Sequence, residues 1–193
     1  MKYCIALIRS GATASAVEGR YIGTKDEPVT QLEKERLCAK KENCLAPRAV
    51  YSGAFLRCRE TANVLYPNHD IFALSDLRPL DYGCFTGENY IEMRESPLFE
   101  QWARSSQLTA FPGGEDLNQC MARNCRIFES VIDEAAQCQI DQISIIAHAS
   151  FIRHVVHRFC VPRNRYRFMR IREGERINLI YDSGERVAYM DRA

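Results

Sequence analysis

The chain has 193 residues, the size of one large domain, and we expect a single domain over residues 1–193. Its 26 lysines and arginines balance 25 aspartates and glutamates, which argues against a protein that coats nucleic acid or binds a membrane surface. Nine cysteines form an odd set without a Cys-x-x-Cys pair, so we expect reduced thiols, no disulfide framework, and neither a metal nor another cofactor.

The first predicted element is a strand over residues 3–9, a short apolar run that ends in a polar loop. The run is too short to span a membrane and lacks the features of a signal peptide, so we expect a cytoplasmic protein without a membrane partner. The loop over residues 9–13 reads Arg-Ser-Gly-Ala-Thr. Ligands of open α/β sheets gather beyond the carboxyl ends of strands, so this loop is a candidate site, although taken alone such a sequence is more often an ordinary turn.

Apolar runs then alternate with helical patterns, which predicts an α/β fold with a parallel sheet flanked by helices. Thr30 and Glu33 form a capping box, in which each side chain satisfies a backbone donor at the start of a helix. Two short runs near the end of the chain indicate a hairpin. The predicted strands are 3–9, 48–52, 71–73 and 143–147, the helices are 31–42, 54–65, 91–105 with a break before Pro97, 115–136 and 151–159, and the hairpin strands are 177–181 and 187–190.

The second strand and the helix after it contain a candidate anion-binding residue. Residues 51–62 read Tyr-Ser-Gly-Ala-Phe-Leu-Arg-Cys-Arg-Glu-Thr-Ala, so Arg57 lies near the start of the helix. Its planar guanidinium keeps its charge and can meet two phosphate oxygens at once. Taken alone, Arg57 and Arg59 would more often be solvent-facing partners of ion pairs.

Two later segments carry further candidates. Gly-Gly-Glu-Asp over residues 113–116 precedes a long helix that contains Arg123, and Asp116 suits the cap of that helix. Residues 145–150 read Ile-Ile-Ala-His-Ala-Ser, which places His148 at the end of a buried strand. Such a histidine is by itself more often a satisfied core residue than a ligand.

Taken in order, these four segments resemble the histidine phosphatase (phosphoglycerate mutase-like) superfamily over roughly residues 3–160. In that family the first arginine is followed by a histidine that becomes phosphorylated during the reaction. The resemblance implies a three-layer α/β/α fold with a pocket at the carboxyl ends of the strands. Segment 81–90 looks most like the small bacterial phosphatases of the α-ribazole phosphatase type. The phosphate-binding residues that the resemblance implies are Arg9, Thr13, Arg57 and His148.

Three positions depart from the family pattern in ways that affect its chemistry. Ser10 stands in place of the phosphorylated histidine, and a serine hydroxyl is a poor nucleophile near neutral pH without a base or a metal. Pro79 stands where the family has a glutamate that protonates the leaving oxygen, and such general acid help is worth ~10²–10⁴ in rate. Ala16 replaces an asparagine that binds phosphate in many relatives.

The sequence therefore predicts a degenerate relative that binds phosphate or a phosphorylated small molecule, with phosphatase activity lost or severely impaired. Such a protein would act as a sensor, a scaffold or a regulator. One alternative is an active phosphomonoesterase in which Ser10 or water attacks with help from His148. Asp81 is then the candidate substitute acid, with Glu115 and Asp116 as further options.

The second alternative is an interaction module that uses an arginine-rich segment over residues 153–176, in which Glu173 and Glu175 are the only acids. Such a run is most often a solvated face, and its functional interpretation is a docking surface for an acidic protein partner or another polyanion. The interleaved Tyr166 and Phe168 permit base stacking without demanding it, so nucleic acid is not the expected partner. The arginines of the segment are Arg153, Arg158, Arg163, Arg165, Arg167, Arg170, Arg172 and Arg176.

Overall fold

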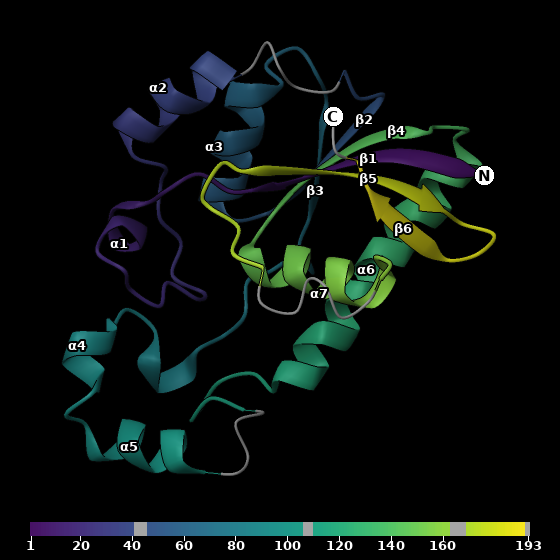
Figure 1. The fold of residues 1–193 in the computed structure, drawn as a ribbon. Coiled ribbons are helices and arrows are strands. Elements are labelled where there is room, and N and C mark those ends of the chain that lie inside the picture. Colours follow the sequence, from purple (N-terminus) through teal and green to yellow (C-terminus); the bar gives the residue numbers. More distant parts are fainter. Residues whose placement is uncertain (41–45, 106–109, 163–168, 192–193) are drawn as a thin grey trace.

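The computed structural model describes residues 1–40, 46–105, 110–162 and 169–191, and its centre is one six-stranded sheet (Figure 1). The strands are β1 (Lys2–Arg9), β2 (Ala49–Gly53), β3 (Ile71–Leu74), β4 (Gln142–Ala147), β5 (Arg176–Asp182) and β6 (Val187–Met190). Their order is β3-β2-β4-β1-β5-β6, in which β1 to β4 are parallel and the hairpin β5-β6 is antiparallel. The prediction of a mainly parallel sheet is confirmed.

The pairing of β1 with β4 brings two of the candidate motifs together. Both strands are largely buried, because the central strands of such a sheet are covered on both faces. Their register aligns Arg9 with Ala147, and the Ser10 backbone N–H donates to the Ala147 carbonyl at 2.9 Å. Ser10 and His148 therefore leave the same edge of the sheet on neighbouring strands.

Helices cover both faces of the sheet, which confirms the three-layer α/β/α arrangement (Figure 1). Ala6 and Ile8 of β1 pack on one side, and Ile5 and Leu7 pack on the other, as alternate residues of a strand do. The helices are α1 (Ala14–Val17), α2 (Gln31–Lys40), α3 (Leu56–Leu65), α4 (Tyr90–Met93), α5 (Pro97–Arg104), α6 (Leu117–Gln137) and α7 (Ala149–Phe159), with a short 3₁₀ helix over Gly83–Phe85. The first face is covered by α2 and α3, and the second by α6 and α7.

The start of α2 keeps half of the predicted capping box. Thr30 Oγ1 accepts the Glu33 backbone N–H at 3.3 Å. The Glu33 carboxylate pairs instead with Arg36, one turn along the helix, at 2.5 Å. The helix is described as far as Lys40, and the end of the predicted helix 31–42 lies outside the described residues.

The other predicted helices are confirmed with shifts at their ends. Helix α3 begins at Leu56 rather than at residue 54, and α4 and α5 are separated before Pro97. Asp116 caps α6 as expected, since its carboxylate accepts the backbone N–H groups of Asn118 and Gln119. The short helix α1 and the 3₁₀ helix are additions that no periodic pattern predicts, because such short elements do not complete a period.

An aromatic cluster joins α4, α5 and the start of α6 away from the two sheet faces. Trp102 stacks on Phe111 with ring centroids 5.0 Å apart, and Phe111 meets Tyr82 edge to face at 5.0 Å. Aromatic pairs of this geometry are worth about 0.5–1.5 kcal/mol beyond the area they bury. The cluster thereby fixes the segment around Tyr82.

Two further observations concern the described part of the chain. None of its helices combines the length and the apolar character that crossing a bilayer requires. Its cysteines are free thiols, and Cys44 lies outside the described residues.

Candidate functional site

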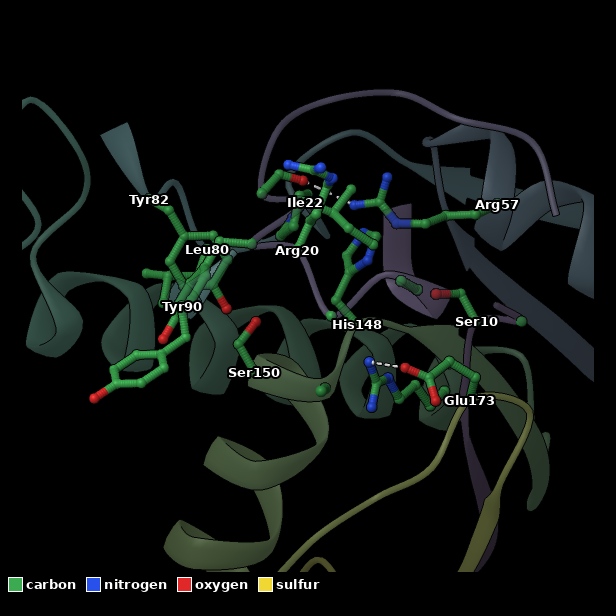
Figure 2. A pocket seen from close by; sticks show the side chains of 18 residues that line it. Ser10, Arg20, Ile22, Arg57, Leu80, Tyr82, Tyr90, His148, Ser150 and Glu173 are labelled. Atoms are coloured by element: carbon green, nitrogen blue, oxygen red, sulfur yellow. Dashed lines mark hydrogen bonds and ion pairs between the residues drawn. The ribbon is translucent and has the colours of Figure 1, made fainter. Parts of the chain in front are cut away.

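A cavity of about 360 Å³ opens at the carboxyl ends of β1 and β4, and we call it the first pocket (Figure 2). Its volume is typical of small-molecule sites. It brings together Arg9, Ser10, Arg57 and His148 of the predicted site residues. The other lining residues are Gly11, Ala16, Gly19, Arg20, Tyr21, Ile22, Gly23, Pro79, Leu80, Tyr82, Tyr90, Ala149, Ser150 and Glu173.

Arg9 ends β1, and the loop before β5 holds both its side chain and its main chain. Nη1 donates to the Ile171 carbonyl at 2.6 Å, and Nη2 pairs with Glu173 Oε1 at 2.5 Å. The Gly174 N–H donates to the Arg9 carbonyl, and the Arg9 N–H donates to the Glu175 carbonyl, each at 3.0 Å. Burial lowers the pKa of Arg9, and the charge of Glu173 opposes that shift. Arg9 is therefore already paired with one carboxylate of the first pocket, that of Glu173.

The backbone that carries Ser10 is fixed by its neighbour Gly11. A Cβ at Gly11 would meet the side chains of Glu33 and Leu37 at 3.0 Å, so only glycine fits without displacing them. The Gly11 N–H donates to Thr61 Oγ1 at 2.8 Å. Ser10 itself is buried in the floor of the first pocket.

Cys58 of α3 contacts both Ser10 and His148. The Ser10 side chain lies close enough to the thiol to lower its pKa slightly, and Sγ lies 3.6 Å from His148 Nε2. Burial raises the pKa of Cys58 to about 12, so the thiol keeps its proton at neutral pH. Within the described residues, no hydrogen bond joins Ser10 to His148, whose Nε2 lies against the Cys58 thiol instead.

His148 follows β4 and is the N-cap residue of α7. Its ring packs edge to face on Phe55 with centroids 5.6 Å apart. Burial, together with the positive charges of Arg57 and Arg9, holds the pKa of His148 well below 6.5. The imidazole is therefore neutral at neutral pH, with one nitrogen as a donor and the other as an acceptor.

Arg57 points into the first pocket from α3 and is only 4% exposed (Figure 2). Nη1 donates to the Lys25 carbonyl at 2.8 Å and Nη2 to the Gly23 carbonyl at 2.9 Å. The guanidinium also lies 5.1 Å from the ring centroid of Phe55. The solvent-facing alternative is therefore wrong for Arg57, although Arg59 on the same helix is exposed.

Arg20 is a third arginine of the first pocket, which the motifs do not single out as a site residue. It pairs with Glu92 at 2.7 Å and with Glu18 at 2.6 Å, and it donates to the Gly87 carbonyl at 2.8 Å. The hydrogen bonds to Glu92 and Glu18 raise its pKa. Because Glu92 lies on α4, only the folded chain brings this arginine and its partners to the pocket.

The substituted positions Ala16 and Pro79 both line the first pocket. Neither side chain offers a hydrogen-bond donor or acceptor to a ligand. Leu80, Tyr82 and Tyr90 continue this wall, and Figure 2 shows them across the pocket from Ser10. The first pocket thus has a polar side on the sheet and a largely apolar and aromatic side on the segment after β3.

Thr13 and Asp81 do not line the first pocket, contrary to the sequence-based assignment. Thr13 is fully buried and caps α1, where its Oγ1 accepts the Ala16 backbone N–H at 3.2 Å. The carboxylate of Asp81 accepts the Gly83 backbone N–H at 2.9 Å. Both side chains therefore stabilise local backbone turns.

Glu115 and Asp116 do not line the first pocket either. Glu115 pairs with Arg123 at 2.8 Å and with Arg78 at 3.1 Å. Burial opposes ionisation of Glu115, but the hydrogen bonds and charge of Arg123 outweigh it and hold the pKa of that carboxyl below its usual value. Asp116 is occupied as the cap of α6.

Glu173 is the one carboxylate that lines the first pocket in the described part of the chain. The sequence shows it only as an acid within the arginine-rich segment, because nothing local relates it to Arg9. Among the described residues, no group of three or more His, Cys, Asp or Glu side chains is arranged to hold a metal ion. The lining of the first pocket offers hydrogen-bond donors and positive charge.

The arginine-rich segment is described only in part. Arg163, Arg165 and Arg167 lie outside the described residues, as do Tyr166 and Phe168. The described arginines of the segment do not line the first pocket, and they are Arg153, Arg158, Arg170, Arg172 and Arg176.

Solved structures with this arrangement of sheet and helices include phosphatases and mutases. An alpha-ribazole phosphatase from Shigella flexneri superposes with a TM-score of 0.81 at 18% identity, over 97% of this chain and 94% of that chain. A phosphoglycerate mutase from Bacillus anthracis str. Sterne gives a TM-score of 0.80 at 17% identity, over 100% of this chain and 92% of that chain. At such identities the likeness establishes the phosphoglycerate mutase-like fold.

Sequence comparison supplies the family. A 2,3-bisphosphoglycerate-dependent phosphoglycerate mutase from Rhizobium etli is 27% identical over 163 residues, which cover 77% of this chain and 76% of that protein. The family model of the histidine phosphatase superfamily (branch 1) matches residues 5–190, a span that includes the whole first pocket. The chain therefore belongs to the histidine phosphatase superfamily, branch 1.

Proposed function

We propose that the chain binds phosphate or a phosphorylated small molecule in the first pocket, and that its phosphatase activity is lost or severely impaired. The proposal rests on the lining of one cavity. Arg9, Arg57 and His148 can bind an anion there, whereas Ser10 and Pro79 stand where the family has its nucleophile and its general acid. Membership of a phosphatase and mutase family supports a phosphorylated ligand. The substitutions at positions 10 and 79 remove groups that react, while Arg9, Arg57 and His148 remain to bind an anion.

The environment of Ser10 supports the loss of the nucleophile. A serine hydroxyl attacks phosphorus only when a base takes its proton or a metal lowers its pKa. Ser10 lies beside the neutral thiol of Cys58. His148 Nε2 lies 3.6 Å from the sulfur of the same thiol. Ser10 is therefore a hydroxyl that can hydrogen-bond a bound anion, without the partner that would activate it.

The pocket wall supports the loss of the general acid. Pro79 has no proton to give, and Glu173 is turned towards Arg9 in an ion pair of 2.5 Å. A missing general acid lowers the rate by ~10²–10⁴, in addition to the loss of the nucleophile. The two losses together exceed what either one would do alone.

Anion binding is supported by the donors that remain. A guanidinium has five N–H donors, and Arg57 uses one from each of its two terminal nitrogens on backbone carbonyls. The neutral imidazole of His148 adds one more donor. An orthophosphate alone would leave the wall of Leu80 and Tyr82 uncovered, which favours a phosphate attached to an apolar or ring-containing group.

Activity of the purified chain tests this proposal. The unchanged protein should not hydrolyse p-nitrophenyl phosphate or a panel of phosphorylated metabolites. A variant with Ser10→His and Pro79→Glu should gain measurable turnover, because it restores the nucleophile and the acid in a pocket that keeps Arg9, Arg57 and His148. Robust activity of the unchanged chain, abolished by Ser10→Ala, would contradict the proposal and establish a serine-based phosphomonoesterase.

Thermal melting tests the binding half of the same proposal. Millimolar phosphate should raise the melting temperature of the unchanged chain, because a ligand that binds only the folded state stabilises it. Arg57→Gln should reduce this rise, whereas Arg59→Gln, an exposed change on the same helix, should not. The absence of any rise in the unchanged chain would leave Arg9 and Arg57 with a structural role only.

A further inference from the structure

A second cavity of about 740 Å³ shares Arg9 and Glu173 with the first pocket, and we call it the basic cavity. Its other lining residues are absent from the lining of the first pocket. Six cationic side chains face two carboxylates there, those of Glu173 and Glu175. The cationic residues are Arg9, Arg36, Lys40, Arg153, Arg170 and Arg172.

The cations of the basic cavity come from separate parts of the chain. Arg36 and Lys40 lie one turn apart at the end of α2, and Arg153 lies on α7. Arg170 and Arg172 belong to the segment before β5. Charges that follow one another along an exposed helix usually form a solvated face. Here the fold brings charges from β1, α2, α7 and the segment before β5 to the rim of one hollow.

The carboxylates of the basic cavity are already engaged. Glu173 pairs with Arg9 at 2.5 Å, and its backbone carbonyl accepts a hydrogen bond from Arg36. The carboxylate of Glu175 accepts the Arg172 backbone N–H at 2.5 Å, which leaves the Arg172 guanidinium without that partner. These acids therefore neutralise only part of the positive charge.

Three guanidinium groups of the basic cavity remain available. Over the described residues, no hydrogen bond or ion pair engages the side chains of Arg153, Arg170 or Arg172, and all three are exposed. Like charges that share a hollow repel one another, and a bound polyanion relieves that repulsion. Guanidinium groups also match phosphate oxygens bidentately.

We propose that the basic cavity binds a small molecule that carries two or more phosphate groups. Two such groups carry about three to four negative charges at pH 7, and the guanidinium groups of Arg153, Arg170 and Arg172 supply three positive charges that no carboxylate of the described residues pairs. A single phosphate would meet only two or three of these guanidinium groups. A small molecule fits better than an acidic protein segment, because the cations surround a hollow rather than extend across a flat face.

Calorimetric titration of the full chain with inorganic tripolyphosphate tests this proposal. Arg153→Gln combined with Arg170→Gln should weaken binding about tenfold or more, because each change removes a charge-assisted contact. The control combines Arg158→Gln with Arg104→Gln, two exposed changes that remove the same charge outside both cavities. It should shift the affinity by less than about twofold.

Each remaining outcome contradicts the proposal. An unchanged affinity in the Arg153 and Arg170 double variant would show that tripolyphosphate binds elsewhere. An equal loss in the control would show general attraction to a basic protein. Tighter binding of a short polyglutamate peptide than of tripolyphosphate, lost in the double variant, would assign the cavity to an acidic protein partner. None of the substituted residues lines the first pocket. The proposal for the basic cavity can therefore fail while the proposed function of the first pocket holds, and the reverse is also true.

Discussion

Glu173 controls how much positive charge the first pocket offers to a ligand. Its side chain is 30% exposed and that of Arg9 is 24% exposed, so their ion pair is partly screened by water. Pairs of this kind contribute about 0–1 kcal/mol to stability. The larger effect is on binding, because an incoming phosphate must share Arg9 with a carboxylate of the same sign.

Glu173→Gln should therefore tighten phosphate binding by about five- to tenfold, which corresponds to about 1–1.4 kcal/mol. The change removes the competing charge and keeps a side chain of similar size. Calorimetry with orthophosphate at constant ionic strength measures the effect, and Glu95→Gln, an exposed change between α4 and α5, serves as the control. Weaker binding in Glu173→Gln would mean that the carboxylate helps to hold the ligand.

The site residues that the sequence could predict are those at the ends of regular elements. Arg9 ends a strand and His148 directly follows one, and both patterns are visible in a local run of residues. Glu173 and Arg20 reach the first pocket from loops, whose course depends on contacts distant in sequence. Asp81 is a predicted site residue that the structure uses elsewhere, because its carboxylate accepts the backbone N–H of Gly83, which has a positive φ of 54°.

At the scale of elements, Thr61 joins helix α3 to the loop after β1. Its hydroxyl donates to the Arg57 carbonyl at 2.6 Å and accepts the Gly11 N–H at 2.8 Å, and the residue is fully buried. The loop that carries Ser10 is thus bound to the helix that carries Arg57. One buried hydroxyl therefore links the two segments that carry Ser10 and Arg57.

Thr61→Val should lower the free energy of unfolding by about 1–3 kcal/mol, because it leaves the buried Gly11 N–H without an acceptor. Urea denaturation measures the loss. Thr86→Val is the matched control, since Thr86 Oγ1 is buried without a hydrogen-bond partner in the described structure, and its removal should be neutral or stabilising. Equal losses in the two variants would show that the cost comes from packing at valine.

The elements themselves were predictable where burial is continuous. Strands β1 and β4 are read from unbroken apolar runs, because both of their faces are covered. Only the Thr30 half of the predicted capping box at α2 is present. The Glu33 carboxylate pairs with the Arg36 guanidinium, which is a stronger partner than a backbone N–H. That competition depends on a charged neighbour one turn away, which a capping pattern does not include.

The whole molecule keeps the buried His148 and the half-buried His154 uncharged, which makes its stability depend on pH. Burial and the charge of Arg153 lower the pKa of His154 to about 4, and the pKa of His148 lies well below 6.5. Below about pH 6.5 the unfolded chain takes up protons that the folded chain does not bind. The contribution of these two histidines to the free energy of unfolding is therefore complete above about pH 6.5 and falls as the pH decreases towards about 4.

His154→Gln should reduce the drop in melting temperature between about pH 7 and about pH 5. Glutamine keeps an acceptor for the Asn124 amide, which lies 2.9 Å from His154 Nδ1 and links α6 to α7, but it does not titrate. His157→Gln, an exposed change on the same helix, should retain the full drop. Circular dichroism melts at the two pH values measure the difference, and an identical drop in all three proteins would exclude His154 as a source.

The aromatic cluster gives the molecule an optical signal of its own. Trp102 is the only tryptophan of the chain, and its indole N–H donates to the Ala110 carbonyl at 2.8 Å. Through Phe111 it touches Tyr82, which lines the first pocket. Indole emission responds to the polarity and packing of its surroundings. A ligand that moves Tyr82 therefore changes the fluorescence of one known residue, and binding in the first pocket can be followed without a label.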